Sequence, residues 1–74
     1  MTTTNKIHNK VREGRFFANE MTQQDLAELV GVTRQTIMAI EKGKYSPSLE
    51  VAFKIALVFG KSLEEGFSYQ PVAD

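Results

Sequence analysis

The residues best equipped to recognise another molecule form one short polar run, Thr33-Arg34-Gln35-Thr36. The guanidinium group of arginine can form a bidentate pair with guanine, and the carboxamide of glutamine can do the same with adenine. Threonine hydroxyls can bond a phosphate, and threonine methyl groups can contact the methyl group of thymine. This run therefore has the chemistry needed to read base edges in the major groove of double-stranded DNA.

Other residues near this run could contact DNA as well. Gln23 stands at the start of the preceding predicted helix, where free backbone amides suit a phosphate. Lys42 and Lys44 follow the run and could reach the phosphate backbone, although exposed lysines are common. Met38 could contact a thymine methyl group or lie at the edge of the core. Tyr45 could bond a phosphate or pack its ring beneath its own loop.

Capping and turn residues predict a helix-turn-helix over about residues 22–42, which would position these side chains. Thr22 followed by Asp25 matches a capping box, with aspartate in place of the usual glutamate. Gly31 suits a left-handed helix end, and Thr33 suits the N-cap of the next helix. Two short helices joined by a tight turn that contains glycine define the motif.

The flanking sequence predicts three further helices, and so an all-α, five-helix fold. The first spans residues 10 to about 18, with Asn9 as its N-cap. The fourth begins after Ser48 and is apolar on most sides, which predicts a central, largely buried helix. The fifth is short, covering residues 63 to about 66 after the cap Ser62.

Apolar residues at helical spacing predict the core. They are Val11, with Phe16 and Phe17 at the far end of the first helix, then Leu26, Ala27, Leu29, Val30, Val32, Ile37 and Ile40. Alternating aromatic and polar residues at 67–70 give a weak strand signal, and residues 6–8 could supply the partner strand of a small β-ribbon.

Length and composition predict a single domain over residues 1–74. The net charge is zero, although residues 1–61 alone carry +3 from nine basic and six acidic side chains. With no cysteine, the chain can form neither a disulfide nor a thiolate metal site. It has no apolar run near the roughly 20 residues that span a bilayer. Its polar N-terminus has no signal-peptide core, so we expect a cytoplasmic protein without membrane contact.

Enzymatic chemistry and metal binding have little support in the sequence. His8 is the single histidine, and no nucleophile–base pattern or phosphate-binding glycine loop occurs. The carboxylates are better explained as helix caps and solvated surface charges. Glu41 has a further possible role, since it could pair with Arg34 or a nearby lysine and orient it. We therefore expect a protein that is not an enzyme and needs no cofactor.

Four pieces of the sequence carry a family resemblance: Met21-Thr22-Gln23, Gly31-Val32-Thr33-Arg34-Gln35-Thr36-Ile37, Ile40-Glu41-Lys42-Gly43-Lys44-Tyr45 and Pro47-Ser48-Leu49. Over roughly residues 10–69 the chain resembles the short, stand-alone subgroup of Xre/Cro-like, phage-repressor-type helix-turn-helix transcriptional regulators. The resemblance implies five helices, operator binding as a homodimer and no cofactor. The chain departs from the family at Gly14, where a large apolar residue is usual, and at Asn19-Glu20, which lengthens the first interhelical loop by one residue.

The apolar residues of the C-terminal tail, Phe67, Tyr69 and Val72, could form the interface of this homodimer or cover the core of their own chain. A homodimer would place two recognition helices one DNA turn apart, about 34 Å, and would read a palindrome.

The sequence thus favours a sequence-specific DNA-binding transcriptional regulator. Repression by promoter occupancy is the favoured mode, because no effector domain is evident. The alternative is a protein-interaction module of antitoxin or anti-regulator type, whose apolar tail binds a different chain. The neutral net charge keeps this alternative open.

Overall fold

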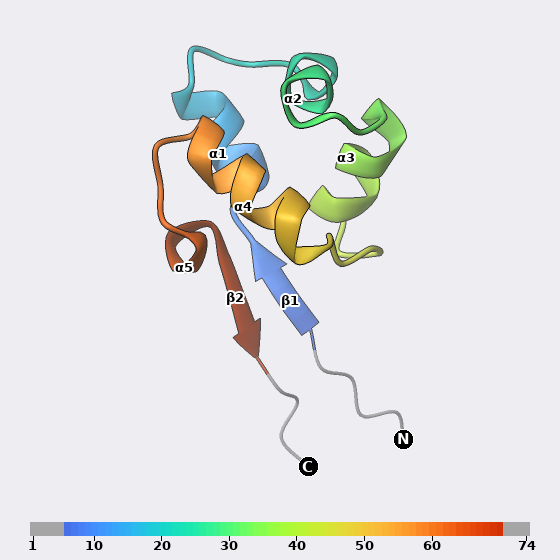
Figure 1. Cartoon of the computed structure of the whole chain (residues 1–74), viewed down its shortest axis with the longest axis vertical. Coiled ribbons are helices and arrows are strands. Elements are labelled where there is room, and N and C mark those ends of the chain that lie inside the picture. The colour runs from blue at the N-terminus through green and yellow to red at the C-terminus, as the bar shows by residue number, and fades with distance from the viewer. Residues whose placement is uncertain (1–5, 71–74) are drawn as a thin grey trace.

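The computed structural model describes residues 6–70, in which five helices pack around one core and a two-stranded ribbon extends from the bundle (Figure 1). The helices are α1 Val11–Phe17, α2 Gln23–Val30, α3 Arg34–Glu41, α4 Leu49–Val58 and α5 Leu63–Gly66. The strands β1 Lys6–Asn9 and β2 Phe67–Gln70 pair antiparallel, with Ile7 opposite Tyr69. The predicted five-helix fold and its small terminal ribbon are confirmed.

Four helices begin at a hydroxyl residue whose side chain accepts a backbone N–H three positions later; these caps are Thr22, Thr33, Ser48 and Ser62. Full capping boxes form with Asp25 in α2 and with Glu65 in α5. The backbone N–H of Ser62 lowers the pKa of the Glu65 carboxyl, and a hydrogen bond with the Ser62 side chain adds to this effect. The ionised carboxylate therefore supports α5 at neutral pH, and this support is lost as pH falls through the lowered pKa.

The first helix begins one residue later than the sequence predicted. Its N-cap is Lys10, which makes no side-chain cap hydrogen bond, so the assignment of Asn9 as N-cap is wrong. Asn9 is instead the last residue of β1, and its side chain joins three elements. Its Oδ1 accepts the Val11 N–H at 3.2 Å, while its Nδ2 donates to the Ile40 carbonyl at 2.8 Å. One amide thus ties the ribbon to the start of α1 and the end of α3.

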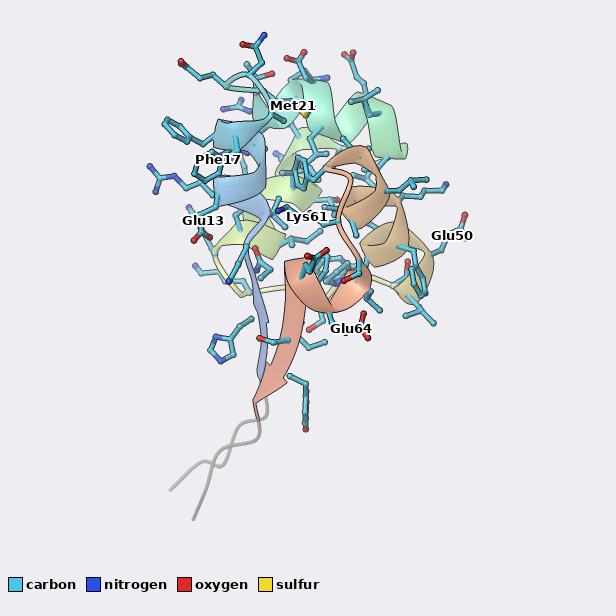
Figure 2. All side chains as sticks on the ribbon, turned by 90° about the vertical axis from the view of Figure 1, so that its left-hand side faces the viewer. Glu13, Phe17, Met21, Glu50, Lys61 and Glu64 are labelled. Carbon is cyan, nitrogen blue, oxygen red and sulfur yellow. The ribbon has the colours of Figure 1, made fainter. Side chains whose placement is uncertain are left out.

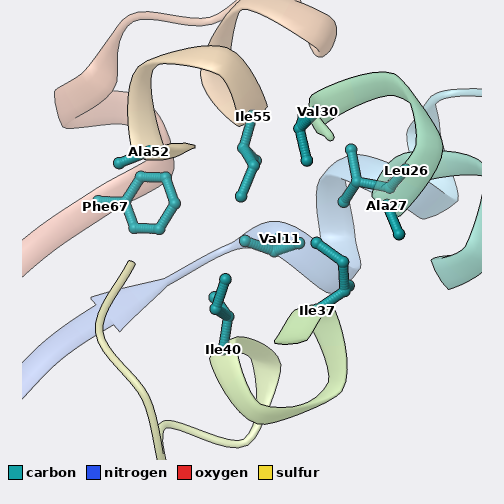
Figure 3. Packing of buried hydrophobic residues seen from close by; sticks show 9 residues of the cluster. All are labelled: Val11, Leu26, Ala27, Val30, Ile37, Ile40, Ala52, Ile55 and Phe67. Carbon is teal, nitrogen blue, oxygen red and sulfur yellow. The ribbon is translucent and has the colours of Figure 1, made fainter. Parts of the chain in front are cut away.

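The core draws at least one residue from every helix except α5, together with one residue from β2 (Figure 3). Its buried members are Val11, Leu26, Ala27, Val30, Ile37, Ile40, Ala52, Ile55 and Phe67. Ala27 is fully buried where α2 packs on α3, as expected for a close helix crossing. Phe67 fills the core of its own chain, which is the alternative that the sequence left open for the apolar tail.

Several apolar residues predicted for the core lie on the surface instead. Phe16 and Phe17 are 63% and 82% exposed and stack edge to face with each other, and Figure 2 shows Phe17 at the outer side of α1. Leu29 is 61% exposed on α2. The fourth helix is also not largely buried. It packs on α2 and α5 and buries Ala52, Ile55 and Ala56, but Leu49, Phe53 and Leu57 remain exposed.

Gly14 is explained by Phe59, the C-cap residue of α4. A Cβ atom built on Gly14 would lie 2.5 Å from Cδ2 and 2.6 Å from Cε2 of the Phe59 ring. The Phe59 ring at the end of α4 therefore fills the space that a large side chain at position 14 would need. Neither Phe16 nor Phe17 fills it, because both side chains are exposed.

We expect Gly14→Ala to destabilise the domain. The alanine gains about 1 kcal/mol of helix propensity, but overpacking costs about 1–3 kcal/mol, which leaves a net loss of up to about 2 kcal/mol. In a Phe59→Val background the same change should stabilise the domain. Urea unfolding measures both differences, with Gly66→Ala as the control because a Cβ there meets nothing within 4 Å. Stabilisation by Gly14→Ala in the wild-type background would show that the ring does not hold this position.

Candidate nucleic-acid interface

The turn between α2 and α3 fixes the direction in which α3 leaves the bundle. Gly31 takes the left-handed conformation with φ of 79°, as predicted, and its N–H bonds the Ala27 carbonyl at 2.9 Å. The N–H of Val32 bonds the same carbonyl at 3.0 Å. Thr33 then caps α3, while Ile37 and Ile40 hold its inner face in the core. The inner face of α3 is therefore fixed to the core, while the outer face of its first turn is exposed.

Arg34 and Gln35 are exposed on this first turn. The neighbouring threonines are engaged in the cap, because Thr33 Oγ1 accepts the Thr36 N–H at 3.1 Å and lies 3.0 Å from Thr36 Oγ1. Within residues 6–70, by contrast, no hydrogen bond or ion pair engages the side chains of Arg34 and Gln35. These two polar groups are thus available to bind another molecule.

An open cleft of about 1030 Å³ runs along α3, between this helix, α1 and the start of α2. From α3 it is lined by Arg34, Met38 and Lys42, which are spaced four residues apart and so share one face. From α1 it receives Arg12, a residue that the sequence analysis did not single out. The charged lining residues are Arg12, Arg15, Arg34 and Lys42 against Glu20 and Glu41, a net charge of +2.

A partly buried ion pair at the floor of the cleft joins α1 to α3. Arg15 donates from Nε to Glu41 Oε2 at 2.6 Å and from Nη2 to Oε1 at 3.0 Å. Its Nη1 donates to the Met21 carbonyl at 3.0 Å, which adds the loop before α2. Gln23 Nε2 donates to Glu41 Oε1 at 3.1 Å. One carboxylate therefore fixes the end of α3 against both preceding helices.

This network corrects the role predicted for Glu41. The carboxylate pairs with Arg15 and not with Arg34 or a lysine, so it neutralises a structural arginine and leaves Arg34 unpaired within the described residues. The same carboxylate accepts a hydrogen bond from the side chain of Gln23. The backbone N–H of Gln23 lies in the first turn of α2. Sequence spacing could not reveal the pair, because its members are 26 positions apart.

The loop between α1 and α2 brings the Met21 carbonyl to Arg15. Asn19 and Glu20 both have positive φ, 63° and 57°, an uncommon conformation for residues other than glycine. They stand where the sequence indicated one extra loop residue. The Met21 N–H bonds the Arg15 carbonyl at 2.9 Å, so the loop is fastened to Arg15 through its backbone as well as through the guanidinium group.

The remaining candidates for DNA contact follow α3 in sequence. Lys42, Lys44 and Tyr45 are all exposed, and the Tyr45 side chain is 52% exposed. Gly43, with φ of 75°, turns the chain between the two lysines, and the Lys44 N–H bonds the Ala39 carbonyl at 2.9 Å.

The residues predicted for a dimer interface are separated by the fold. Phe67 is only 9% exposed, whereas Tyr69, two residues further along β2, is 59% exposed. Val72 lies outside the described residues. Across residues 6–70, no cluster of three potential metal ligands forms, and no helix is long and apolar enough to cross a membrane.

Known helix-turn-helix regulators resemble this chain over most of its length. A helix-turn-helix family model matches residues 11–66. The chain is 56% identical to an uncharacterized HTH-type transcriptional regulator of Methanocaldococcus jannaschii, an alignment that covers 86% of this chain and 96% of the relative. It is 51% identical to YgzD, an uncharacterized HTH-type transcriptional regulator of Bacillus subtilis, over 82% and 91% of the two chains. It is 35% identical to the cryptic phage CTXphi transcriptional repressor RstR of Vibrio cholerae, over 77% of this chain and 50% of RstR.

Removal of the Glu41 carboxylate tests the structural role of the ion pair. We expect Glu41→Ala to lower the free energy of unfolding by up to about 3–5 kcal/mol, because it leaves a mostly buried guanidinium group unpaired. Glu28→Gln is the control, since this exposed carboxylate of α2 accepts a hydrogen bond from the Gln24 carboxamide and forms no ion pair within residues 6–70. A change within about 0.5 kcal/mol is expected. Equal urea midpoints for the two variants would contradict the role assigned to Glu41.

Proposed function

The chain belongs to the Xre-like helix-turn-helix family of DNA-binding transcriptional regulators, and we propose that it binds a specific operator through α3. Members of this family are not known as enzymes. The observation that carries the proposal is the exposed pair Arg34 and Gln35 on the first turn of a helix held by a mostly buried ion pair. Fixed geometry matters because a bidentate contact with a base edge needs a side chain that starts from a defined position.

We propose that Arg34 and Gln35 read base edges in the major groove. Thr36 and Met38 are half-buried on the same helix, and their methyl groups suit contact with a thymine methyl group. Thr33 serves first as the cap of α3, so its contribution to DNA binding is to hold the helix start and to offer its exposed hydroxyl to a phosphate.

Phosphate contacts are proposed on both sides of the recognition helix. On the cleft side, Arg12 supplies charge, and the backbone N–H of Gln23 lies in the first turn of α2, where N–H groups suit an anion. Lys42 also lines the cleft, and beyond it, on the other side of the end of α3, Lys44 and Tyr45 are exposed. Such contacts supply affinity and orientation without sequence information.

The proposed functional unit is a homodimer on a palindromic operator. Two copies would place their recognition helices about 34 Å apart, one turn of DNA. Pairing would also stabilise a domain whose core is small. We propose repression by occupying a promoter, and the relative RstR is itself named a repressor.

Replacing Arg34 by alanine should weaken binding to the operator by about 1–3 kcal/mol and relax the preference at one position of each half-site. Gel-shift titration against the upstream region of its own gene measures this loss. Lys61→Ala is the matched control, because Lys61 is a basic residue beyond the end of α4, outside the α3 cleft (Figure 2). Operator affinity that is unchanged in the Arg34 variant would refute the assignment of α3 as the reading helix.

Replacing Arg12 by alanine should act differently, because a phosphate contact carries no base information. We expect weaker binding to all duplexes alike, and a salt dependence of log K shallower by about one unit in slope. Filter binding from low to moderate salt on operator and random duplexes measures both effects. A loss confined to the operator would instead make Arg12 a base-reading residue.

A further inference from the structure

The exposed face of α4 carries three large apolar side chains. Leu49, Phe53 and Leu57 are 66%, 52% and 79% exposed, and they recur every four residues along the helix. This spacing places them in one stripe. The stripe lies outside the buried face of α4, which is formed by Ala52, Ile55 and Ala56, so the core of its own chain does not cover it. An exposed apolar face of this kind marks a contact surface.

The stripe is symmetric about its middle residue, which favours a second copy of this chain as its occupant. When two such helices pack antiparallel across a two-fold axis at Phe53, Leu49 of each copy faces Leu57 of the other. Phe53 then faces its own equivalent. A two-fold interface requires one patch to be complementary to itself, and this sequence of side chains meets that requirement.

The charges that border the stripe select the same arrangement. Glu50 and Lys54 lie along one flank and form an ion pair of 3.1 Å within the chain, and Figure 2 shows Glu50 projecting from the outer side of α4. In the antiparallel pair, Glu50 of one copy and Lys54 of the other lie on the same flank, offset by about 3 Å along the axis at a rise of 1.5 Å per residue. A parallel pair would instead place the charged flanks of the two copies on opposite sides of the interface, so Glu50 and Lys54 could not pair between copies.

The residues beside Leu49 extend this surface. A mainly apolar groove lined by Ile7, Leu63 and Tyr69 adjoins Leu49, and Tyr69 is exposed there. Three side chains on a helix of about 15 Å give less than the roughly 800 Å² per partner of a standard interface. The groove enlarges the contact and brings the predicted interface residue Tyr69 to its edge.

We propose that α4 is the surface through which two copies of this chain pair, antiparallel across a two-fold axis at Phe53, with Glu50 and Lys54 exchanged between the copies. The inference rests on the proposed homodimer and names the contact that forms it.

Charge variants of full-length protein test the pairing by sedimentation equilibrium. In the antiparallel pair, Glu50→Lys gathers four positive charges on the shared flank, two from each copy, and Lys54→Glu gathers four negative ones. Each variant alone should therefore be monomeric at concentrations where the wild type is dimeric. An equimolar mixture of the two should form a dimer, and the double variant E50K/K54E should pair with itself. Leu57→Glu should be monomeric. Leu29→Glu, which changes an apolar position of α2 that is also largely exposed, should pair as the wild type does.

Duplexes with one half-site or two separate this inference from the proposed function. Monomeric α4 variants should bind a single half-site as the wild type does and lose at least about tenfold on the full palindrome. Arg34→Ala should weaken half-site binding and remain dimeric. A wild-type dimer that persists in Leu57→Glu and in both single charge variants would overturn the α4 interface while leaving recognition by α3 intact. A wild-type chain that stays monomeric on the palindrome would overturn it as well.

Discussion

The ion pair between Arg15 and Glu41 is the constraint on which the recognition surface depends. It joins α1 to α3 through two hydrogen bonds, and the same two side chains also engage Met21 and Gln23. A carboxylate removed from water in this way is stabilised only while its partners stay in place. The network therefore couples the position of α3 to α1, to the loop before α2 and to the start of α2. It leaves Arg34, which lines the cleft, unpaired among the residues that the structure describes.

Local chemistry explains why the sequence predicted the helix-turn-helix well. The cap hydroxyls, the capping box at Thr22 and the left-handed turn at Gly31 act over three or four residues, so their spacing is visible in the chain. Contacts between distant segments were not visible. The sequence could not show that Asn9 bonds Ile40, that Phe59 covers Gly14, or that Glu41 binds Arg15.

The sequence wrongly predicted burial for several apolar residues that lie on the surface, most of all on α4. Helix α4 is apolar nearly all round, which predicted a buried helix, but the described chain covers only its inner side. A core of nine residues is small, and the apolar area left on α4 suits association better than a monomeric state. The exposed stripe on α4 therefore supports the proposed homodimer.

Selection of binding sites from a pool of random duplexes, run in parallel with wild-type protein and Gln35→Ala, tests the central claim that α3 reads bases. The account predicts that the wild type enriches a two-fold symmetric motif with half-sites one turn apart. It also predicts that the variant enriches the same motif with one position relaxed in each half-site. Identical motifs for the two proteins, or no enrichment by the wild type, would contradict it.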